Sequence, residues 1–345
     1  MITVIIPLFN KRPYLLRALD SVYAQTSPVD EIVIVNDGST DGGDAIAKAQ
    51  RDPRVRVIDQ PNQGVSAARN AGIESAKQPY VAFLDADDLW LPGFLARIKE
   101  MLETSPGAAL YGTGFATVAD GREIRRYGVR EKVFKRRGAG LRRWGCDRPV
   151  FGPVDFFKVW SHGHVIHTSS TVVPRQAALD VGGFPEGVTH GEDLEFWAKL
   201  ALRGTVVLSP DILTHYHVDV PGQAVEYWEG AYKRDFEVLP YHRFLALKMA
   251  EILSGTTKIT KGTKCGFLLY CRREFLKGLL QRLYWGDMEA FSRFYHELQL
   301  NRGGYGTGVE ICAWMADHPV CYPFVCSLAR IARQMRQNSE SPRAK

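Results

Sequence analysis

Three carboxylates stand within four residues at the end of an apolar run: Asp85, Asp87 and Asp88 follow residues 80–84. Like charges at the mouth of a buried strand repel one another unless a cation compensates them, and hard oxygen ligands select Mg²⁺ or Mn²⁺. A divalent ion at this point bridges a diphosphate and stabilises the charge on a departing nucleoside diphosphate. Solvated loops also carry acids, but the pattern favours a metal and diphosphate site.

A second acidic pair, Glu192 and Asp193, opens a helix expected over residues 193–202. Carboxylates at a helix start are common as caps, so the pair alone decides little. The pair matters here because a hydroxyl that attacks a group carried by a diphosphate, the acceptor hydroxyl, needs a general base within hydrogen-bond reach. We expect Asp193 to be that base, Glu192 to bind the acceptor or orient its partner, and Trp197 on the same helix to bind the acceptor.

Two further polar clusters follow expected strands. Turn chemistry explains most of the Gly-rich segment 36–42, but it does not require Asp37 so close to the strand end. A carboxylate there is placed to accept the imide N–H of uracil. In the other cluster Asn62 leads into Arg69, which pairs either with a phosphate or with Asp85.

A repeated βα pattern positions these clusters. Strands are expected at residues 3–8, 31–35, 55–58 and 80–84, with helical spacing between them, including a helix over 65–76. This alternation predicts a parallel sheet covered by helices, with ligands at the strand C-termini. The polar residues after successive strands would then gather along one edge of the sheet: Asn10, Asp37, Asn62 and Asp85.

The pattern is weaker beyond residue 90. We expect a helix over 92–103, a strand at 108–111 and then a basic, Gly-rich loop, 121–145, ordered by donor binding. The apolar, Thr-rich run at 167–173 is again typical of regular structure, and strands are expected at 205–208 and 212–217.

The chain divides at about residue 222. Residues 1–222 form the expected α/β catalytic domain, and residues 223–345 a helical C-terminal subdomain with a disordered end. Within it, aromatic and aliphatic residues of segment 267–283 alternate with basic ones. This segment is either an amphipathic helix on a bilayer or, the favoured interpretation, part of a packed helical core.

Composition narrows the partners and the compartment. The net charge of +6 is concentrated in short basic runs, at 122–126 and 135–143, which are solvated faces or contacts to phosphates or an anionic membrane. No aromatic-interleaved or zinc-binding module accompanies them, which argues against nucleic acid. Six cysteines without CxxC spacing, and no signal peptide or spanning segment, predict a cytoplasmic protein, with peripheral contact at the cytoplasmic membrane face through the basic C-terminal part.

Taken together, the clusters resemble glycosyltransferase family 2, which has the GT-A fold. The resemblance covers residues 1–220, and each motif alone is weak to moderate, whereas their order and spacing are specific. The matching segments are 4–10, 36–39, 64–72, 84–88, 182–184 and 192–193.

The resemblance implies a Rossmann-like, mainly parallel sheet flanked by helices, and inverting transfer from a nucleotide-sugar, with UDP the expected nucleotide and Mn²⁺ or Mg²⁺ the cofactor. It assigns donor binding to Pro7, Phe9, Asn10, Asp37, Asn62, Arg69, Asp85 and Ala86, metal binding to Asp87, Asp88 and His217, and catalysis to Asp193 and Glu192. The histidine after the last strand is ambiguous between His215 and His217, with His217 favoured.

The processive members' Gln-x-x-Arg-Trp motif has no match here, since residues 281–285 carry Tyr at the Arg position, so a single addition is expected. The acceptor is expected to be a hydroxyl of a glycan or lipid-linked glycan in cell-envelope polysaccharide synthesis. Transfer to a polyprenyl phosphate is the alternative, but it needs no strong base such as Asp193. A nucleotidyltransferase would need a Gly-rich phosphate loop after the first strand, and a non-catalytic nucleotide-sugar-binding protein would not need the intact acids.

Overall fold

The computed structural model describes residues 1–129, 150–151, 153–160, 164–188 and 191–221, together with residues 248, 267, 270 and 271. Their strands are β1 (Ile2–Leu8), β2 (Glu31–Asp37), β3 (Val55–Gln60), β4 (Tyr80–Phe83), β5 (Leu89–Trp90), β6 (Leu110–Ala119), β7 (Arg122–Tyr127), β8 (Val150–Phe151), β9 (Thr171–Pro174) and β10 (Val206–His217). Their helices are α1 (Arg12–Tyr23), α2 (Gly43–Lys48), α3 (Val65–Ser75), α4 (Phe94–Thr104), α6 (Pro153–Trp160), α7 (Arg175–Asp180) and α8 (Glu192–Arg203), with the 3₁₀ helix η1 (Thr168–Ser170).

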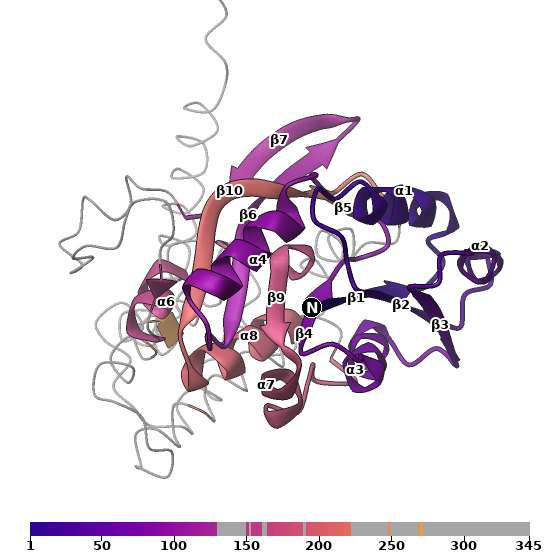
Figure 1. Cartoon of the computed structure of the whole chain (residues 1–345). Helices are drawn as coiled ribbons and strands as arrows, with labels where there is room; N and C mark the ends of the chain where they lie inside the picture. Colours follow the sequence, from indigo (N-terminus) through magenta and orange to yellow (C-terminus); the bar gives the residue numbers. More distant parts are fainter. Residues whose placement is uncertain are drawn as a thin grey trace, which may run out of the picture.

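All described strands join one sheet, in the order β3-β2-β1-β4-β9-β6-β10-β5, with β7 beside β6 and β8 beside β10 (Figure 1). The first four strands pair in parallel, and β1 and β2 are buried along their whole length. Such two-sided burial explains why these strands read as nearly continuous apolar runs. The βα alternation expected from the sequence is therefore confirmed.

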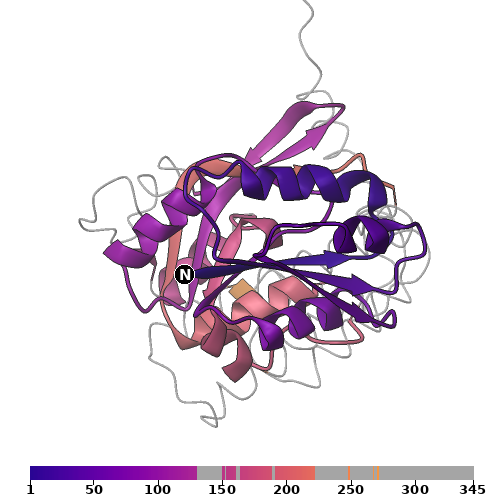
Figure 2. The same ribbon diagram turned by 45° about the vertical axis from the view of Figure 1, so that its right-hand side comes forward.

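Helices cover both faces of the sheet (Figure 2). One apolar cluster gathers the inward faces of α1 and α4 above β1, and a second packs α3, α7 and α8 against the opposite face. Phe196 and Trp197 of α8 are buried in the second cluster. The layers hold the strand ends, and the polar residues that follow them, in fixed positions.

The second half of the sheet is mixed: β6 and β10 pair in parallel, and antiparallel strands lie around them. β9 runs antiparallel to both β4 and β6, and β5 and β8 run antiparallel to β10. The apolar pattern of a strand does not encode its direction, which depends on the connection before it. The two strands expected at 205–208 and 212–217 also form a single strand, β10, with register shifts between Leu208 and Thr214.

The start of the expected loop at 121–145 is instead a β-hairpin. β7 pairs with β6 around a turn in which Asp120 has φ 49° and Gly121 has φ 70°, a conformation suited to tight hairpins. The hairpin projects from the sheet (Figure 1). The remainder of that expected loop, from residue 130, lies outside the described residues, as does the basic run 135–143.

Most of the expected C-terminal subdomain, 223–345, also lies outside the described residues. Four of its residues are described, at positions 248, 267, 270 and 271. Phe267 and Tyr270 are buried beside α6: the rings of Phe157 and Phe267 lie 5.1 Å apart, and those of Trp160 and Tyr270 lie 4.7 Å apart. Cys271 is fully buried in the same cluster. The remainder of segment 267–283 lies outside the described residues.

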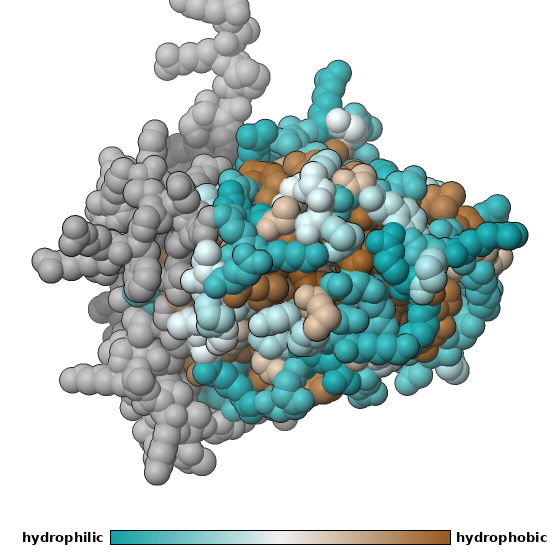
Figure 3. Space-filling model, viewed as in Figure 1, coloured by the Kyte–Doolittle hydropathy of each residue, from teal (hydrophilic) through white to brown (hydrophobic). Residues whose placement is uncertain are grey.

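The surface shown in Figure 3 is largely hydrophilic, with hydrophobic residues in separate areas between polar ones. Isolated apolar side chains on a surface are normal. In the part of the chain that the structure describes, every helix is too short or too polar to cross a membrane.

Candidate active site

Asp85 to Asp88, which begin two positions after the last residue of β4, form an acidic turn at the C-terminal edge of the sheet. The backbone N–H of Asp88 donates to the carbonyl of Asp85 over 3.0 Å, which closes the turn. Just before it, the N–H of Leu84 donates to Ile5 of β1. The parallel pairing of β1 and β4 thus places the acids beside the end of β1, as the sequence pattern requires.

Arg69 connects the acidic turn with the start of α8. Its guanidinium is buried, with 4% of the side chain exposed, and donates to Asp85 over 2.8 Å and to Glu192 over 3.1 Å. The guanidinium also lies over the Phe184 ring, 5.1 Å from its centroid. From the sequence, Arg69 is expected to pair either with a phosphate or with Asp85. In this structure it pairs with the carboxylates of Asp85 and Glu192.

This arrangement keeps both members of the pair charged. Burial opposes the charge on Arg69, but Asp85 and Glu192 outweigh it, so the pKa of Arg69 is raised. Burial likewise acts to raise the pKa of Asp85, but the Arg69 charge reverses the effect and the pKa of Asp85 is lowered. Arg69 therefore works as a fixed internal cation.

Asp88 ties the acidic turn to two distant segments. Its carboxylate is fully buried and accepts from the Ser169 hydroxyl of η1 over 2.5 Å and from the backbone N–H of His217 over 3.1 Å. Burial, followed by the charges of Asp87 and Asp85, raises the pKa of Asp88 well above its usual value. The contact brings the end of β10 to the acids.

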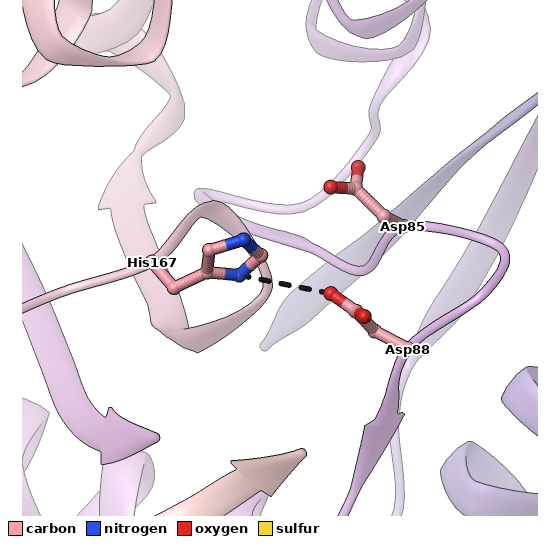
Figure 4. A group of neighbouring side chains, drawn as sticks. All are labelled: Asp85, Asp88 and His167. Atoms are coloured by element: carbon pink, nitrogen blue, oxygen red, sulfur yellow. Dashed lines mark ion pairs between the residues drawn. The ribbon is translucent and has the colours of Figure 1, made fainter. Parts of the chain in front are cut away.

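Asp85, Asp88 and His167 each offer a ligand atom to a common point (Figure 4), and these atoms lie within 4.8 Å of one another. The Nδ1 of His167 lies 3.6 Å from an Asp88 oxygen. Burial lowers the pKa of His167 to about 4 against the opposing charge of Asp85, so its imidazole is neutral at pH 7. Two carboxylates and a neutral imidazole fit a divalent ion such as Mn²⁺.

His167 cannot be recognised as a candidate ligand from the sequence, because it stands far along the chain from the acidic turn, at the start of an apolar, Thr-rich run. Its local signal is the polar stretch Thr168 to Ser170, since His167 caps η1 by accepting from the Ser169 N–H. That signal marks a helix start and not a ligand, so only the fold reveals its neighbours.

Asp87, the metal ligand implied by the resemblance, is paired with a lysine. Its carboxylate lies 3.0 Å from Nζ of Lys11, which also donates to the carbonyl of Pro221 over 3.0 Å. From α1, Arg17 donates to the Asp87 backbone carbonyl over 2.6 Å. Both the side chain and the backbone of Asp87 are thus held from the β1–α1 segment.

Of the two histidines near the end of β10, His217 lies beside the acidic turn, where its backbone N–H contacts Asp88. Burial lowers the pKa of His217 to about 4, and the Arg17 charge acts in the same direction. The ring of His215 instead lies 3.1 Å from Glu123 on β7. His217 is thus the nearer of the two to the acidic turn, and its role as a ligand stays a prediction.

Asp37 organises the loop that follows β3. One carboxylate oxygen accepts from the Gln60 side chain over 2.7 Å and from the Gln63 N–H over 2.9 Å, and the other accepts from the Gly64 N–H over 2.9 Å. A carboxylate offers about four acceptor positions. Described residues of the chain use three of these positions.

The other residues expected to bind the nucleotide-sugar donor lie at the same edge of the sheet. Phe9 directly follows β1 and is 44% exposed, whereas Pro7 and Ala86 are buried. Asn10 has φ 50°, and its side-chain oxygen accepts from the Thr40 N–H over 2.9 Å, which joins the loops after β1 and β2.

Asn62 is exposed beside Gly38, whose φ is 75°. A Cβ at Gly38 would lie 2.9 Å from the Asn62 nitrogen, so the close approach of these two loops requires glycine.

Asp193 lies half-buried in the first turn of α8, next to Glu192. Burial, followed by the Glu192 charge, raises the pKa of Asp193 to about 7. This value suits a general base near neutral pH. Trp197 lies on the inward face of α8, 1% exposed and packed 6.1 Å from Trp160, so the structure places it in the core and not at an acceptor surface.

The turn before Phe184 supports the ring beneath Arg69. Asn70 of α3 donates to the Phe184 carbonyl over 2.9 Å and accepts from the Phe184 N–H over 2.8 Å. Gly183, with φ 66°, fits against this amide, and a Cβ there would collide with the Asn70 Oδ1.

We expect Gly183→Ala to lower the free energy of unfolding by about 2–4 kcal/mol, because backbone strain and a steric collision add. Gly182→Ala is the matched control, since Gly182 has φ 79° but no described atom within 4 Å of a Cβ, and it should lose only about 1 kcal/mol. Urea unfolding measures both. Equal losses would show that the Asn70 contact does not restrict the turn.

Known proteins resemble this chain in its N-terminal part. The model of glycosyl transferase family 2 matches residues 3–153. Among curated relatives, the uncharacterized glycosyltransferase EpsJ of Bacillus subtilis (strain 168) is 38% identical over 117 residues, which cover 33% of this chain and 34% of EpsJ. The match thus spans about a third of that relative's length.

Solved structures share the fold at low sequence identity. The structure of S. aureus TarS 1–349 in complex with UDP-GlcNAc superposes with a TM-score of 0.63 at 19% identity, over 86% of this chain and 81% of TarS 1–349. The mannosyltransferase PcManGT from Pyrobaculum calidifontis, in complex with GDP-Man and Mn²⁺, gives a TM-score of 0.52 at 20% identity, over 95% and 84% of the two chains. The mixed sheet with flanking helices is therefore a GT-A fold.

Proposed function

We propose that this chain, whose residues 3–153 match the model of glycosyl transferase family 2, is a member of that family and transfers one sugar from a UDP-linked donor to an acceptor hydroxyl, with inversion at the anomeric carbon. The acceptor is a glycan or a lipid-linked glycan of cell-envelope polysaccharide synthesis. The reaction takes place in the cytoplasm or at the cytoplasmic face of the membrane.

One observation carries this proposal: Arg69 joins Asp85 of the acidic turn to Glu192, the neighbour of Asp193. The residues that receive the donor diphosphate and the residue that activates the acceptor are thereby held in one rigid unit. Direct displacement requires this arrangement, because nucleophile and leaving group stand on opposite sides of the same carbon.

In the displacement, Asp193 accepts the proton of the acceptor hydroxyl. The acceptor oxygen forms a bond to the anomeric carbon as the bond from that carbon to the phosphate oxygen breaks, and the bonding electrons leave with the nucleoside diphosphate. A pKa of about 7 keeps Asp193 basic enough to take the proton and partly ionised at neutral pH. An α-linked donor then gives a β-linked product.

The acidic turn fits a divalent ion, Mn²⁺ or Mg²⁺. The family resemblance suggests Asp87 and His217, which lies nearby, as the ligands. A second possible set of ligands is Asp85, Asp88 and His167. When bound, the ion supplies Lewis-acid stabilisation of the negative charge on the departing diphosphate. Arg69 adds a permanent positive charge beside Asp85.

Asp37 supports uracil as the base. The described residues leave about one acceptor position on the carboxylate, and uracil presents a single imide N–H, whereas guanine presents both a ring N–H and an amino group on the corresponding edge. The exposed ring of Phe9 offers a flat apolar surface for the base. PcManGT was solved with GDP-Man, so the fold itself accommodates either nucleotide.

Release of UDP from a panel of UDP-sugars with Mn²⁺ tests the proposal, because slow donor hydrolysis needs no known acceptor. We expect metal-dependent release with one sugar of the panel, and none with the corresponding GDP-sugars. No release, together with no UDP binding by calorimetry, would contradict both the nucleotide and the class. Release that is stimulated by a polyprenyl phosphate and not by glycans would instead support the alternative acceptor.

A further inference from the structure

We propose that Lys11 competes with the divalent metal for Asp87, so that the metal binds tightly only when the donor diphosphate is present to receive the lysine. The inference rests on the proposed function, because it concerns the same donor site. It begins from the ion pair of 3.0 Å between Lys11 and Asp87.

The ammonium of Lys11 is held on two sides. Besides Asp87, it donates to the carbonyl of Pro221, which follows the end of β10. Only 16% of the Lys11 side chain and 10% of the Asp87 side chain are exposed, so solvent weakens the pair little. Lys11 therefore occupies the carboxylate that the metal needs.

The other acids of the turn already have partners as well. Asp85 pairs with Arg69, and Asp88 accepts from Ser169 and from the backbone of His217. With Lys11 on Asp87, each carboxylate of the turn has a partner within the chain. A divalent ion that approaches Asp87 alone must displace a cation that is already in place.

Lys11 and Arg69 differ in their freedom to move. Arg69 is locked between two carboxylates above the Phe184 ring, with 4% of its side chain exposed. Lys11 is a compact charge on a flexible stem, at the last position before α1. When a metal takes Asp87, Lys11 is the cation that can leave.

The donor changes the balance because it brings negative charge to the place where Lys11 is released. The diphosphate supplies ligands to the metal and a new anionic partner to the ammonium. Metal and donor therefore favour each other's binding, and linkage makes the coupling equal in both directions. Without the donor, the enzyme therefore binds the metal only weakly.

The test is Mn²⁺ binding by calorimetry and electron paramagnetic resonance, with and without saturating UDP, for wild type, Lys11→Met and Lys11→Arg. We expect Lys11→Met to bind Mn²⁺ about tenfold or more tightly than wild type without UDP, since it removes the competing charge. With UDP the advantage should disappear or reverse. Lys11→Arg should stay close to wild type without UDP.

Lys99→Met is the matched control, because Lys99 also donates to a proline carbonyl, that of Pro28, over 2.7 Å, but lies on α4. Its Mn²⁺ affinity should equal that of wild type. Unchanged or weaker Mn²⁺ binding by a folded Lys11→Met, with wild type binding Mn²⁺ and UDP together, would overturn this inference and leave the proposed function standing. Failure of wild type to bind either Mn²⁺ or UDP would overturn both.

Discussion

Replacing Asp193 with Asn is expected to lower kcat for sugar transfer by about 10²- to 10⁴-fold, the usual contribution of a positioned general base. Asn keeps the size of the side chain but cannot take a proton from the acceptor. Binding of UDP and Mn²⁺ should be unchanged, because Asp193 lies on α8 and outside the acidic turn. Initial rates and calorimetry separate the two effects.

The pH dependence follows from the same residue. The pKa of Asp193 is raised to about 7, and the active base is the deprotonated form, so kcat should rise with pH up to about 7 and then level off. Below pH 7 the rate should fall about tenfold for each unit. In Asp193→Asn the residual rate should lose this dependence.

Glu195→Gln provides the control for Asp193→Asn. Glu195 stands in the same first turn of α8 but pairs with Lys199 over 2.7 Å, so its loss removes a nearby charge without touching the expected base. Its kcat should stay within about twofold of wild type. If Asp193→Asn also retains that rate while Glu192→Gln does not, the base is Glu192.

The second large effect is expected for Asp87→Ala. Loss of this carboxylate should abolish Mn²⁺-stimulated UDP release, a drop of about 100-fold or more, since metal stabilisation of a leaving group contributes several kcal/mol. Asp211→Ala is the control: Asp211 pairs with Arg97 over 2.7 Å outside the acidic turn, and its variant should remain metal-dependent. Chelation of the metal should reduce wild type to the rate of Asp87→Ala.

Two histidine variants decide which ligand set holds the metal. If Asp87 and His217 form it, His217→Ala should weaken Mn²⁺ binding about tenfold or more and His167→Ala should not. If Asp85, Asp88 and His167 form it, the order is reversed. Retention of full Mn²⁺ binding and stimulation by Asp87→Ala would remove Asp87 from both the metal site and the mechanism.

The N-terminal half of the fold was predictable because each step has a local cause. Apolar runs separated by helical spacing specify β1 to β4 and the helices between them, and parallel pairing then brings the residues after each strand to one edge. The placement of the acidic turn and of Asp37 at that edge could be predicted for this reason.

What the sequence did not reveal depends on contacts between distant segments. The direction of β9 and the continuity of β10 are set by their neighbours in the sheet, and His167 meets the acids only through that packing. Trp197 shows the opposite error. It stands four residues after Asp193, so the two side chains share a face of α8, but Trp197 lies one turn deeper in the core and is 1% exposed. A shared helix face does not imply shared access to a ligand.

The bridge from Asp85 through Arg69 to Glu192 also limits how such an enzyme can diversify. Exchanging the start of α8 for that of a relative, to obtain a new acceptor, would remove one of the two partners of Arg69 and so alter the electrostatics around Asp85. The two ends of the reaction are not separable modules. New acceptor preferences should therefore arise by changes in loops that leave Glu192 in place, or by paired changes at both ends of the bridge.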